Sequence, residues 1–497
     1  MRILTAAACA LIALTLAGSA SAETVFGVSD ETPKYTPDGG AAFFEQLKAA
    51  GLRETSVIVH WDPQNPQSIS EGIYLDRVAA QAVASGVRLV FVIIPTKANG
   101  FTTQPSSDLP FLSFLQILAE RYPQVRGFAI GNEPNQPRFW QPQYAPNGAP
   151  MAGAAYETLL ASSYDALKTL DTGIRVIGLG ISERGNDNPR AKNNISTSPV
   201  RFIHDVGAAY RASGRRRPIM DEVAFHPYPA SSTDPLLKGF AWPNAGIANL
   251  DRIKQATWDA FHGTAQRTFE QGLTMRLLEV GWQATVPQQF LSAYTGSENV
   301  ATTDEASQAA IYSQLIRYVS CDPSVSDVLF FHLIDESRLE GFQTGLLRAD
   351  GSPRPSYDAV RQTLAQTGGS CSGIPVAWRH ATDVVGGSAL FRRRGGNFAV
   401  VASADEQVTF VAGIVRLPAR GKPSNGQVIR GLVGSTLPAV QGKVNAYWRA
   451  TVTIPIAGQR PPGRYAVALL LRAALNPGRT SVYLGPPLPS FAVVPSR

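Results

Sequence analysis

Two glutamates of the 497-residue chain lie at positions where a carboxyl group has no packing role. Glu133 follows an apolar run, and Pro134 ends that run directly behind it. Glu279 interrupts a second apolar run, Met275–Val280. A carboxylate among apolar residues costs free energy unless it has a partner or a chemical task. A structural ion pair could explain either glutamate alone, but together they indicate two carboxyl groups for acid–base and nucleophilic chemistry.

Strands and helices alternate from residue 23 to about residue 366. The predicted strands are near-continuous apolar runs, as in parallel strands buried on both faces: Thr24–Ser29, Thr55–His60, Arg88–Ile94, Gly127–Gly131, Arg175–Gly180, Glu222–His226, Met275–Val280 and Asp327–Leu333. The predicted helices are Ala41–Ala50, Tyr74–Ser85, Leu109–Arg121, Ala152–Thr169, Pro199–Ser213, Ile247–Gln271, Asp304–Val319 and Pro355–Gln366.

Eight such units predict an α/β fold, a (β/α)8 TIM barrel, whose chemistry lies where the strands end at their carboxyl face. Glu133 and Glu279 would meet at that face, after strands four and seven. A doubly wound open sheet is the alternative, but such a sheet usually carries a glycine-rich phosphate loop after its first strand, and this chain has none there.

The chain divides into three parts: a secretory signal peptide over residues 1–22, the barrel over 23–370, and a C-terminal β-sandwich over 374–497. Arg2, an apolar run over residues 6–16 and the small residues Ala20-Ser21-Ala22 have the layout of a signal peptide, which predicts a secreted, extracellular protein. The alternative is a buried N-terminal helix. Beyond the glycines at 368, 369 and 373 helical periodicity stops, and six short runs predict antiparallel strands: Ala389–Arg392, Phe398–Ala402, Thr409–Arg416, Ala446–Pro455, Arg464–Arg472 and Thr480–Leu484.

The residues around the two glutamates carry a family resemblance. Asn132-Glu133-Pro134 together with Glu279 resembles the retaining barrel glycosidases of clan A, and most of all glycoside hydrolase family 39. That family is similar in the aromatic pair here at Phe139-Trp140, in the His-x-Tyr segment here at His226-Pro227-Tyr228, and in a histidine after strand two, here His60. The resemblance covers residues 24–366 as an architecture, with motif matches in these segments alone.

The resemblance implies a role for each matching residue. Glu133 is the implied acid/base and Glu279 the implied nucleophile of double displacement, in which the two carboxyl groups stand ~5–5.5 Å apart. Asn132 would donate to the 2-hydroxyl of the sugar, and Tyr228 would hydrogen-bond Glu279 and keep it ionised. His226 and His60 would contact hydroxyls or hold the glutamates, although either could be a satisfied core histidine.

The strand-eight end departs from the clan. Many of these barrels place a tryptophan beneath the innermost sugar there, whereas this chain has His332. Trp282, three residues beyond Glu279, is a substitute stacking surface. Trp61 and Trp140 belong to a set of aromatic residues in the predicted mouth loops, which would suit the C–H faces of an extended glycan. Packing within those loops is the alternative for each ring.

Two cysteines remain once the signal peptide is removed, Cys321 and Cys371, and we expect a disulfide between them in an oxidising compartment. Two separate buried thiols are the alternative. The cysteines lack zinc spacing, and phosphate-binding, calcium and metalloprotease motifs are missing from the sequence. We therefore expect no metal, no cofactor and no nucleic-acid partner. After the signal peptide, no apolar run is long enough for a transmembrane segment.

Charge is divided unequally. Residues 373–497 hold 15 Lys and Arg against 3 Asp and Glu, a net charge of +12, and residues 23–372 carry −6. The basic domain could bind an anionic cell wall or acidic polysaccharide, or it could simply pack on the acidic barrel. Three hypotheses follow: a secreted retaining glycoside hydrolase, a non-catalytic glycan-binding protein on the same scaffold, and a wall-associated adhesin.

Overall fold

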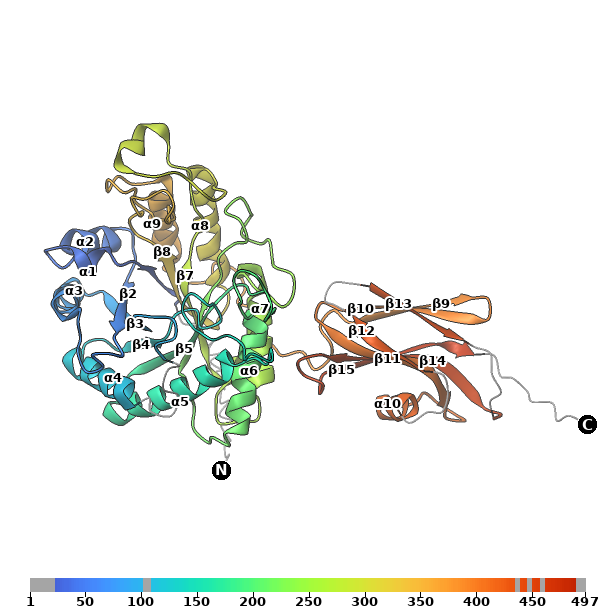
Figure 1. Ribbon diagram of the computed structural model, residues 1–497. Helices are drawn as coiled ribbons and strands as arrows, with labels where there is room; N and C mark the ends of the chain where they lie inside the picture. Colours follow the sequence, from blue (N-terminus) through green and yellow to red (C-terminus); the bar gives the residue numbers. More distant parts are fainter. Residues whose placement is uncertain (1–22, 102–108, 434–438, 445–448, 456–460, 489–497) are drawn as a thin grey trace, which may run out of the picture.

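A computed structural model describes residues 23–101, 109–433, 439–444, 449–455 and 461–488 of the chain. The predicted signal peptide lies outside these residues. The first domain is a closed barrel with the strand order β1 to β8, and the parallel pairing of β1 with β8 closes it (Figure 1). The predicted barrel is therefore confirmed. Its strands are β1 Val25–Ser29, β2 Glu54–Trp61, β3 Arg88–Pro95, β4 Gly127–Ile130, β5 Arg175–Ser182, β6 Glu222–His226, β7 Thr274–Val280 and β8 Val325–Phe331.

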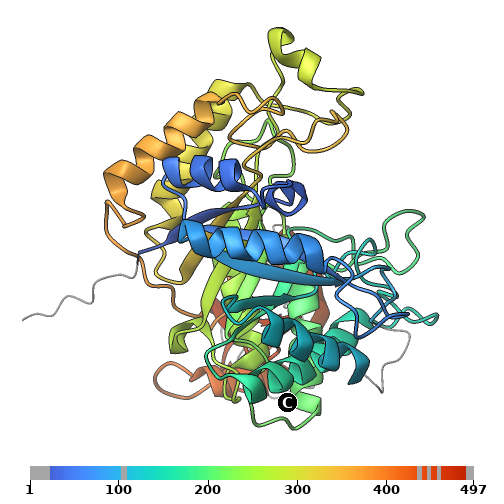
Figure 2. The same cartoon turned by 90° about the vertical axis from the view of Figure 1, so that its left-hand side faces the viewer.

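Helices cover the outside of the barrel, as the second view shows (Figure 2). They are α1 Thr32–Tyr35, α2 Ala41–Ala49, α3 Gly72–Ser85, α4 Leu109–Arg121, α5 Ala152–Leu170, α6 Pro199–Ala212, α7 Leu250–Phe261, α8 Glu305–Val319 and α9 Pro355–Thr367. The single helix predicted over Ile247–Gln271 is wrong, because α7 is flanked by two short 3-10 turns. Gly263, with φ of +70°, follows α7 and lies outside the helical region of backbone space.

The amino-terminal end of the barrel is filled by charged residues. Arg276 on β7 donates to Glu222 at 3.0 Å, contacts Asp327 at 3.2 Å and also bonds Glu54. All four side chains are at most 4% exposed. Arg88 bonds Glu54 and Asp327 from the rim, and Arg175 bonds Glu222. Three arginines thus balance three carboxylates at the floor of the barrel.

The second domain is a sandwich of two antiparallel sheets, of order β13-β10-β9 and β12-β11-β14-β15. Its strands are β9 Ser388–Arg394, β10 Asn397–Ser403, β11 Val408–Leu417, β12 Ala439–Val444, β13 Arg449–Pro455, β14 Arg464–Ala473 and β15 Thr480–Leu488. The predicted sandwich is confirmed, and the strand predicted over 446–455 begins at Arg449 within the described residues.

One element of the sandwich contradicts the expectation that helices end at residue 373. Helix α10, Asn425–Val433, packs on β11 and β14 through Val428 and Leu432. These residues are four positions apart and share one helical face, and nine residues are too few for that periodicity to stand out among strands.

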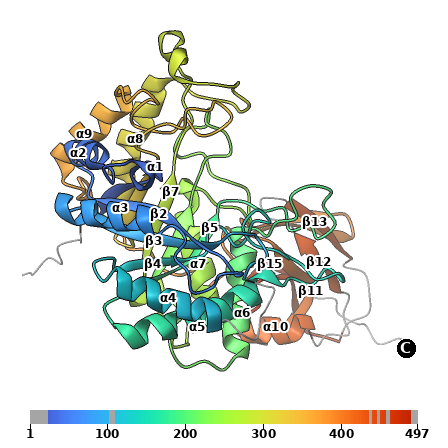
Figure 3. The ribbon, with the colours of Figure 1, turned by 60° about the vertical axis from the view of Figure 1, so that its left-hand side comes forward.

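The sandwich lies beside α6 and α7 of the barrel (Figures 1 and 3). Arg479 of the sandwich donates to Asp259 on α7 at 3.0 Å and to Glu406 of its own domain at 2.6 Å. In the connecting segment His380 stacks on Trp258 with ring centroids 4.0 Å apart. The basic sandwich therefore contacts the acidic barrel through Arg479.

Cys321 and Cys371 form the predicted disulfide, which joins the end of α8 to the segment after α9. Within the described ranges, no helix combines the length and apolarity that a membrane crossing requires.

Candidate active site

The end of β4 is fastened to the end of β5, and this fixes Glu133 at the mouth of the barrel. The Glu133 backbone N–H donates to Gly180 O at 2.7 Å, and Glu133 adopts φ of +39°, a strained value for a side chain with a Cβ. Two residues on, the Asn135 side chain accepts from Ser182 N at 2.9 Å and donates to Ser182 O at 3.2 Å. These contacts hold a backbone conformation that Glu133 would otherwise avoid.

Three side chains converge at the mouth: Glu133 after β4, His226 at the end of β6 and Glu279 in β7. His226 Nδ1 lies 3.1 Å from Glu133 Oε1 and 3.8 Å from Glu279 Oε2. One carboxylate oxygen of each glutamate and the imidazole nitrogen all lie within 4.8 Å of one another. The side chain of Glu133 is 16% exposed and that of Glu279 is 15% exposed, whereas His226 is fully buried. Solvent therefore reaches the two carboxyl groups but not the imidazole.

Tyr228 belongs to the same group. Its hydroxyl donates to Glu279 Oε2 at 2.9 Å, the contact that the resemblance implied. Its ring packs edge-on against Phe331 with centroids 5.8 Å apart, which orients the hydroxyl. A donor to the carboxylate favours the ionised form of Glu279.

Burial raises the proton affinity of both glutamates. Burial raises the pKa of Glu133 to about 7, against the opposing charges of Arg138 and Arg184. Burial also raises the pKa of Glu279, and the Tyr228 hydroxyl opposes that shift. Because burial lowers the pKa of His226, the imidazole is neutral near pH 7 and adds no cation. The hydroxyl that Tyr228 donates to Glu279 favours the charged form of that glutamate.

A third carboxyl group was missed from the sequence. Glu183 follows β5 directly and is 4% exposed. Burial and the neighbouring Glu133 raise the pKa of Glu183 to about 7, so the two groups interact electrostatically. The rule that singled out Glu133, an acidic residue directly after a barrel strand, would have found Glu183 as well had the fifth strand been extended to Ser182.

The other polar residues predicted for the site lie at the ends of barrel strands. His60, at the end of β2, is half-buried, and its Nδ1 lies 3.1 Å from Glu71, which also binds the buried Lys34 at 2.9 Å. Asn132, beside Glu133 in the sequence, is 7% exposed, and His332, after β8, is 8% exposed. Each therefore lies at the mouth end of the barrel.

The rings of Trp61, Trp140 and Trp282, predicted to stack on sugar, are buried in the structure, which favours the packing alternative. Their exposed fractions are 6%, 2% and 1%. Trp61 stacks on Phe101 at 5.6 Å, Trp140 packs against the same ring at 5.6 Å, and the Trp282 indole N–H donates to Asp234 O at 2.9 Å. The large apolar area of each ring is buried where the loops close over the barrel.

A different ring lies exposed beside the site. Phe342, in the loop after β8, is 39% exposed and lies 6.3 Å from the Tyr228 ring and 5.0 Å from Phe331. Its position 63 residues along the chain from Glu279 gave no signal in the sequence.

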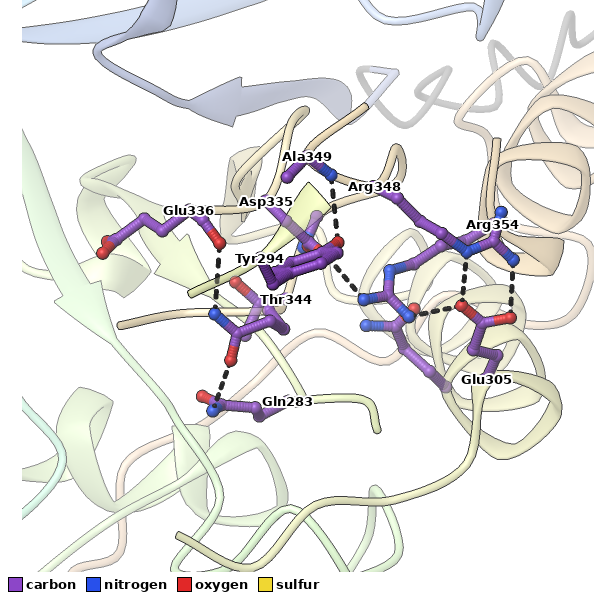
Figure 4. A network of polar contacts seen from close by, with 12 residues as sticks. Gln283, Tyr294, Glu305, Asp335, Glu336, Thr344, Arg348, Ala349 and Arg354 are labelled. Atoms are coloured by element: carbon purple, nitrogen blue, oxygen red, sulfur yellow. Dashed lines mark hydrogen bonds and ion pairs between the residues drawn. The ribbon is translucent and has the colours of Figure 1, made fainter. Parts of the chain in front are cut away.

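A polar network fixes the loop that carries Phe342 (Figure 4). The Tyr294 hydroxyl donates to Asp335 Oδ2 at 2.7 Å and accepts from Ala349 N at 2.9 Å. Arg354, fully buried, bonds both Asp335 and Glu305, the latter at 2.6 Å. The loops after β7 and β8 are thus joined to each other and to the start of α8.

The cluster of Glu133, His226 and Glu279 has the donor types of a metal site. One contact weighs against a cation there, because Tyr228 already donates to a Glu279 oxygen. The geometry suits proton transfer and nucleophilic attack better.

Comparisons with known proteins give structural likenesses alone. No family model matches the sequence, and no curated protein matches it. Among solved structures, the chain is similar to a family 39 glycoside hydrolase from Bacteroides cellulosilyticus WH2, with 16% identity over 88% of this chain and 80% of the other and a TM-score of 0.47. It is similar to a family 39 beta-xylosidase from Caulobacter crescentus, with 15% identity over 91% and 96% and a TM-score of 0.44. It is also similar to a glucosidase from Croceicoccus marinus, with 12% identity over 88% and 95% and a TM-score of 0.48.

The Tyr228–Glu279 hydrogen bond yields a prediction. Tyr228→Phe should lower kcat roughly 10²-fold, the usual effect of removing one preorganised donor. It should also move the acidic limb of the pH–rate profile to higher pH, because Glu279 without its donor protonates more readily. Tyr318→Phe, on the outer surface of α8, is the matched control. Near-normal kcat with an unmoved acidic limb would remove Tyr228 from the active site.

Proposed function

We propose that the protein is a secreted retaining glycoside hydrolase that cleaves O-glycosidic bonds of an oligosaccharide or polysaccharide, with Glu133 as acid/base and Glu279 as nucleophile. The observation that carries this proposal is the spacing of the two carboxyl groups: an oxygen of Glu133 and an oxygen of Glu279 lie within 4.8 Å of each other. The Tyr228 hydroxyl donates to Glu279. Retaining enzymes hold their carboxyl groups ~5–5.5 Å apart, whereas inverting enzymes separate them by ~6.5–9.5 Å to admit a water molecule.

In the first step the Glu279 carboxylate attacks the anomeric carbon. The bond from that carbon to the leaving oxygen breaks, and the leaving oxygen takes the proton of Glu133. A glycosyl ester on Glu279 and an ionised Glu133 result. In the second step Glu133 takes a proton from water, the water oxygen attacks the anomeric carbon, and the ester bond breaks. Two displacements restore both glutamates and retain the anomeric configuration.

Surrounding residues supply orientation. Neutral His226 lies beneath both carboxyl groups and sets their spacing, and Tyr228 keeps one Glu279 oxygen occupied so that the other faces the sugar. Asn132 is the proposed partner of the 2-hydroxyl, a contact that strengthens in the transition state. Phe342, exposed beside Tyr228, is the proposed stacking surface in place of Trp282.

Export is part of the proposal. The signal-peptide pattern of residues 1–22 supports it, as does the Cys321–Cys371 disulfide, since such bonds persist in oxidising compartments. The substrate partner is a carbohydrate.

Variants of the two glutamates test the chemistry. Glu279→Ala should abolish turnover of every glycoside, because no glycosyl-enzyme forms without it. Glu133→Ala should slow substrates with poor leaving groups most, since activated aryl leaving groups need little acid assistance. Added azide should restore turnover of aryl glycosides by Glu133→Ala and give a glycosyl azide of retained configuration, measured by proton NMR.

The alternative is a non-catalytic glycan-binding protein on this scaffold. It predicts that the wild-type chain binds oligosaccharide without turning over any aryl glycoside, and that Glu279→Gln binds and behaves as the wild type does.

In the azide experiment with Glu133→Ala, a glycosyl azide of inverted configuration would contradict the roles assigned to the two glutamates.

We further propose that the sandwich binds an anionic cell wall or acidic polysaccharide. Arg392, Arg393 and Arg394 are exposed on β9, an edge strand of its sheet, and Arg449 is exposed on β13. Replacing Arg392 and Arg394 by Gln in the full chain should weaken retention on an acidic polysaccharide and reduce its sensitivity to salt. The control is the same change at Arg53 and Arg361 on the barrel. If the sandwich variant and the barrel variant are retained equally on the acidic polysaccharide, the sandwich does not bind it and only packs on the barrel.

A further inference from the structure

We propose that Tyr35 and Tyr74 form an outer sugar-binding subsite, on which one unit of an oligosaccharide chain stacks while another unit reaches the catalytic glutamates. The two tyrosines are called the outer aromatic pair below. The inference rests on the proposed glycosidase function and deepens it, because it makes the substrate a chain of several sugars.

Both rings of the outer aromatic pair are exposed on the mouth side of the barrel. Tyr35 is 53% exposed and ends α1, which follows β1, and Tyr74 is 40% exposed in the first turn of α3, which follows β2. Segments that directly follow barrel strands lie at the carboxyl face, where barrel enzymes hold their substrates. Helices α1 and α3 lie side by side next to β2 (Figure 3). The ring centroids are 5.5 Å apart and the ring planes differ by 64°, so the two rings form one corner-shaped surface.

Side chains fasten this surface to the end of β2. Strand β2 extends further toward the mouth than β1, which ends at Ser29. Beyond that point Lys34 Nζ donates to Ile58 O at 2.6 Å, and Glu71 Oε2 accepts from His60 N at 2.9 Å. Residues of α1 and of the turn before α3 thus take the place of a neighbouring strand.

One carboxylate oxygen connects the outer aromatic pair to His60. Glu71 Oε1 lies 2.9 Å from Lys34 Nζ, 3.1 Å from His60 Nδ1 and 3.5 Å from the Tyr35 hydroxyl. Lys34 is fully buried, and its ammonium lies over the Tyr35 ring, 5.0 Å from the centroid. The ring face toward Lys34 therefore points inward, which leaves the opposite face for a ligand.

The register of the strands places His60 near the catalytic residues. His60 is level with Ile94 of β3, the residue after Ile93, whose carbonyl accepts from Gly131 N. Neighbouring strands are about 4.8 Å apart, so the His60 backbone lies within ~10 Å of Gly131, two residues before Glu133. The outer aromatic pair lies on the far side of β2 from β4, so a ligand that contacts both the pair and Glu133 must be longer than one sugar.

The exposed rings of the mouth follow consecutive strands. Phe342 follows β8, Tyr35 follows β1 and Tyr74 follows β2, and in the closed barrel β1 pairs with both β8 and β2. The loop after β8 is also joined to the end of β1, because Asp30 Oδ2 accepts from Leu333 N at 2.9 Å. The outer aromatic pair therefore continues the aromatic surface that begins with Phe342 beside the active site.

The area of the outer aromatic pair indicates the kind of ligand. A buried aromatic side chain covers about 150–250 Å², so two half-exposed rings offer roughly 200 Å². A stable protein partner needs about 800 Å² on each side, which the pair does not provide. Sugar rings present C–H groups that suit aromatic faces. Arg77, whose guanidinium lies 5.4 Å from the centroid of the Tyr74 ring, and Glu71 offer a donor and an acceptor for their hydroxyls.

The test measures kcat/KM of the full chain on cello-, xylo- and manno-oligosaccharides of two to six units. The ratio of kcat/KM for six units to that for two units should fall about tenfold in Tyr35→Ala/Tyr74→Ala, because a disaccharide spans only the cleavage site. Tyr35→Phe/Tyr74→Phe should keep most of the wild-type ratio, since both rings remain. A merely structural role predicts an equal loss for both lengths, and an unchanged ratio would overturn the proposal.

Tyr318→Ala is the matched control, because Tyr318 is 42% exposed on α8 and the substitution removes a ring of the same size. It should leave the ratio at the wild-type value. Sedimentation tests the other occupant: a wild-type dimer that becomes a monomer in Tyr35→Ala/Tyr74→Ala would assign the rings to a contact between copies and overturn the proposal.

A binding measurement separates this proposal from the proposed function. Titration calorimetry of Glu279→Gln with the same six-unit oligosaccharides needs no turnover, and adding Tyr35→Ala/Tyr74→Ala should raise Kd about tenfold. Binding that depends on the tyrosines, together with an absence of turnover by the wild type, would refute the glycosidase alone. An equal Kd with and without the two rings, or no binding of any of these oligosaccharides, would refute the outer subsite.

Discussion

Burial of carboxyl groups inside a parallel barrel is the constraint on which the rest of this structure depends. At the floor, Glu54, Glu222 and Asp327 are balanced by Arg276 and by two arginines at the rim. At the mouth, Glu133 and Glu279 have no such cation between them and face a neutral imidazole. At both ends burial raises the pKa of a carboxyl group to about 7, Glu54 at the floor and Glu133 at the mouth. Arg276 bonds Glu54 at the floor, whereas His226 contacts Glu133 at the mouth, and displaced proton affinities at a mouth open to solvent suit a catalytic site.

Burying carboxyl groups at the mouth, and holding Glu133 in a strained backbone conformation, costs free energy that contacts with the surrounding elements offset. The joint between β4 and β5 keeps Glu133 in a left-handed backbone conformation, and the network of Tyr294, Asp335 and Arg354 holds the loops after β7 and β8. Each of these supports is nearly or fully buried. Rigid supports keep the two carboxyl groups at a fixed spacing, so substrate binding need not first assemble the site.

The barrel could be predicted from the sequence, because each strand is an apolar run that is followed along the chain by a helical pattern. The sequence also predicted Glu133, Glu279 and the contact of Glu279 with Tyr228, because these residues lie at the carboxyl ends of their strands and match a known motif. The role of Trp282 could not be predicted, since an aromatic residue near a strand end is equally suited to stacking on sugar and to closing the core. Phe342 and Glu183 depend on loop geometry and on how far β5 extends, neither of which has a sequence period.

The central claim is that Glu279 becomes covalently attached to the sugar, and trapping that intermediate tests it most directly. The full chain would be incubated with a panel of 2-deoxy-2-fluoro aryl glycosides, whose fluorine slows the second step more than an activated leaving group slows the first. Mass spectrometry of the intact protein and of its peptides would then locate the adduct. We predict one sugar per chain, on the peptide that contains Glu279, and none in Glu279→Gln. A stoichiometric adduct on any other side chain, or turnover with inversion and no adduct, would contradict the account.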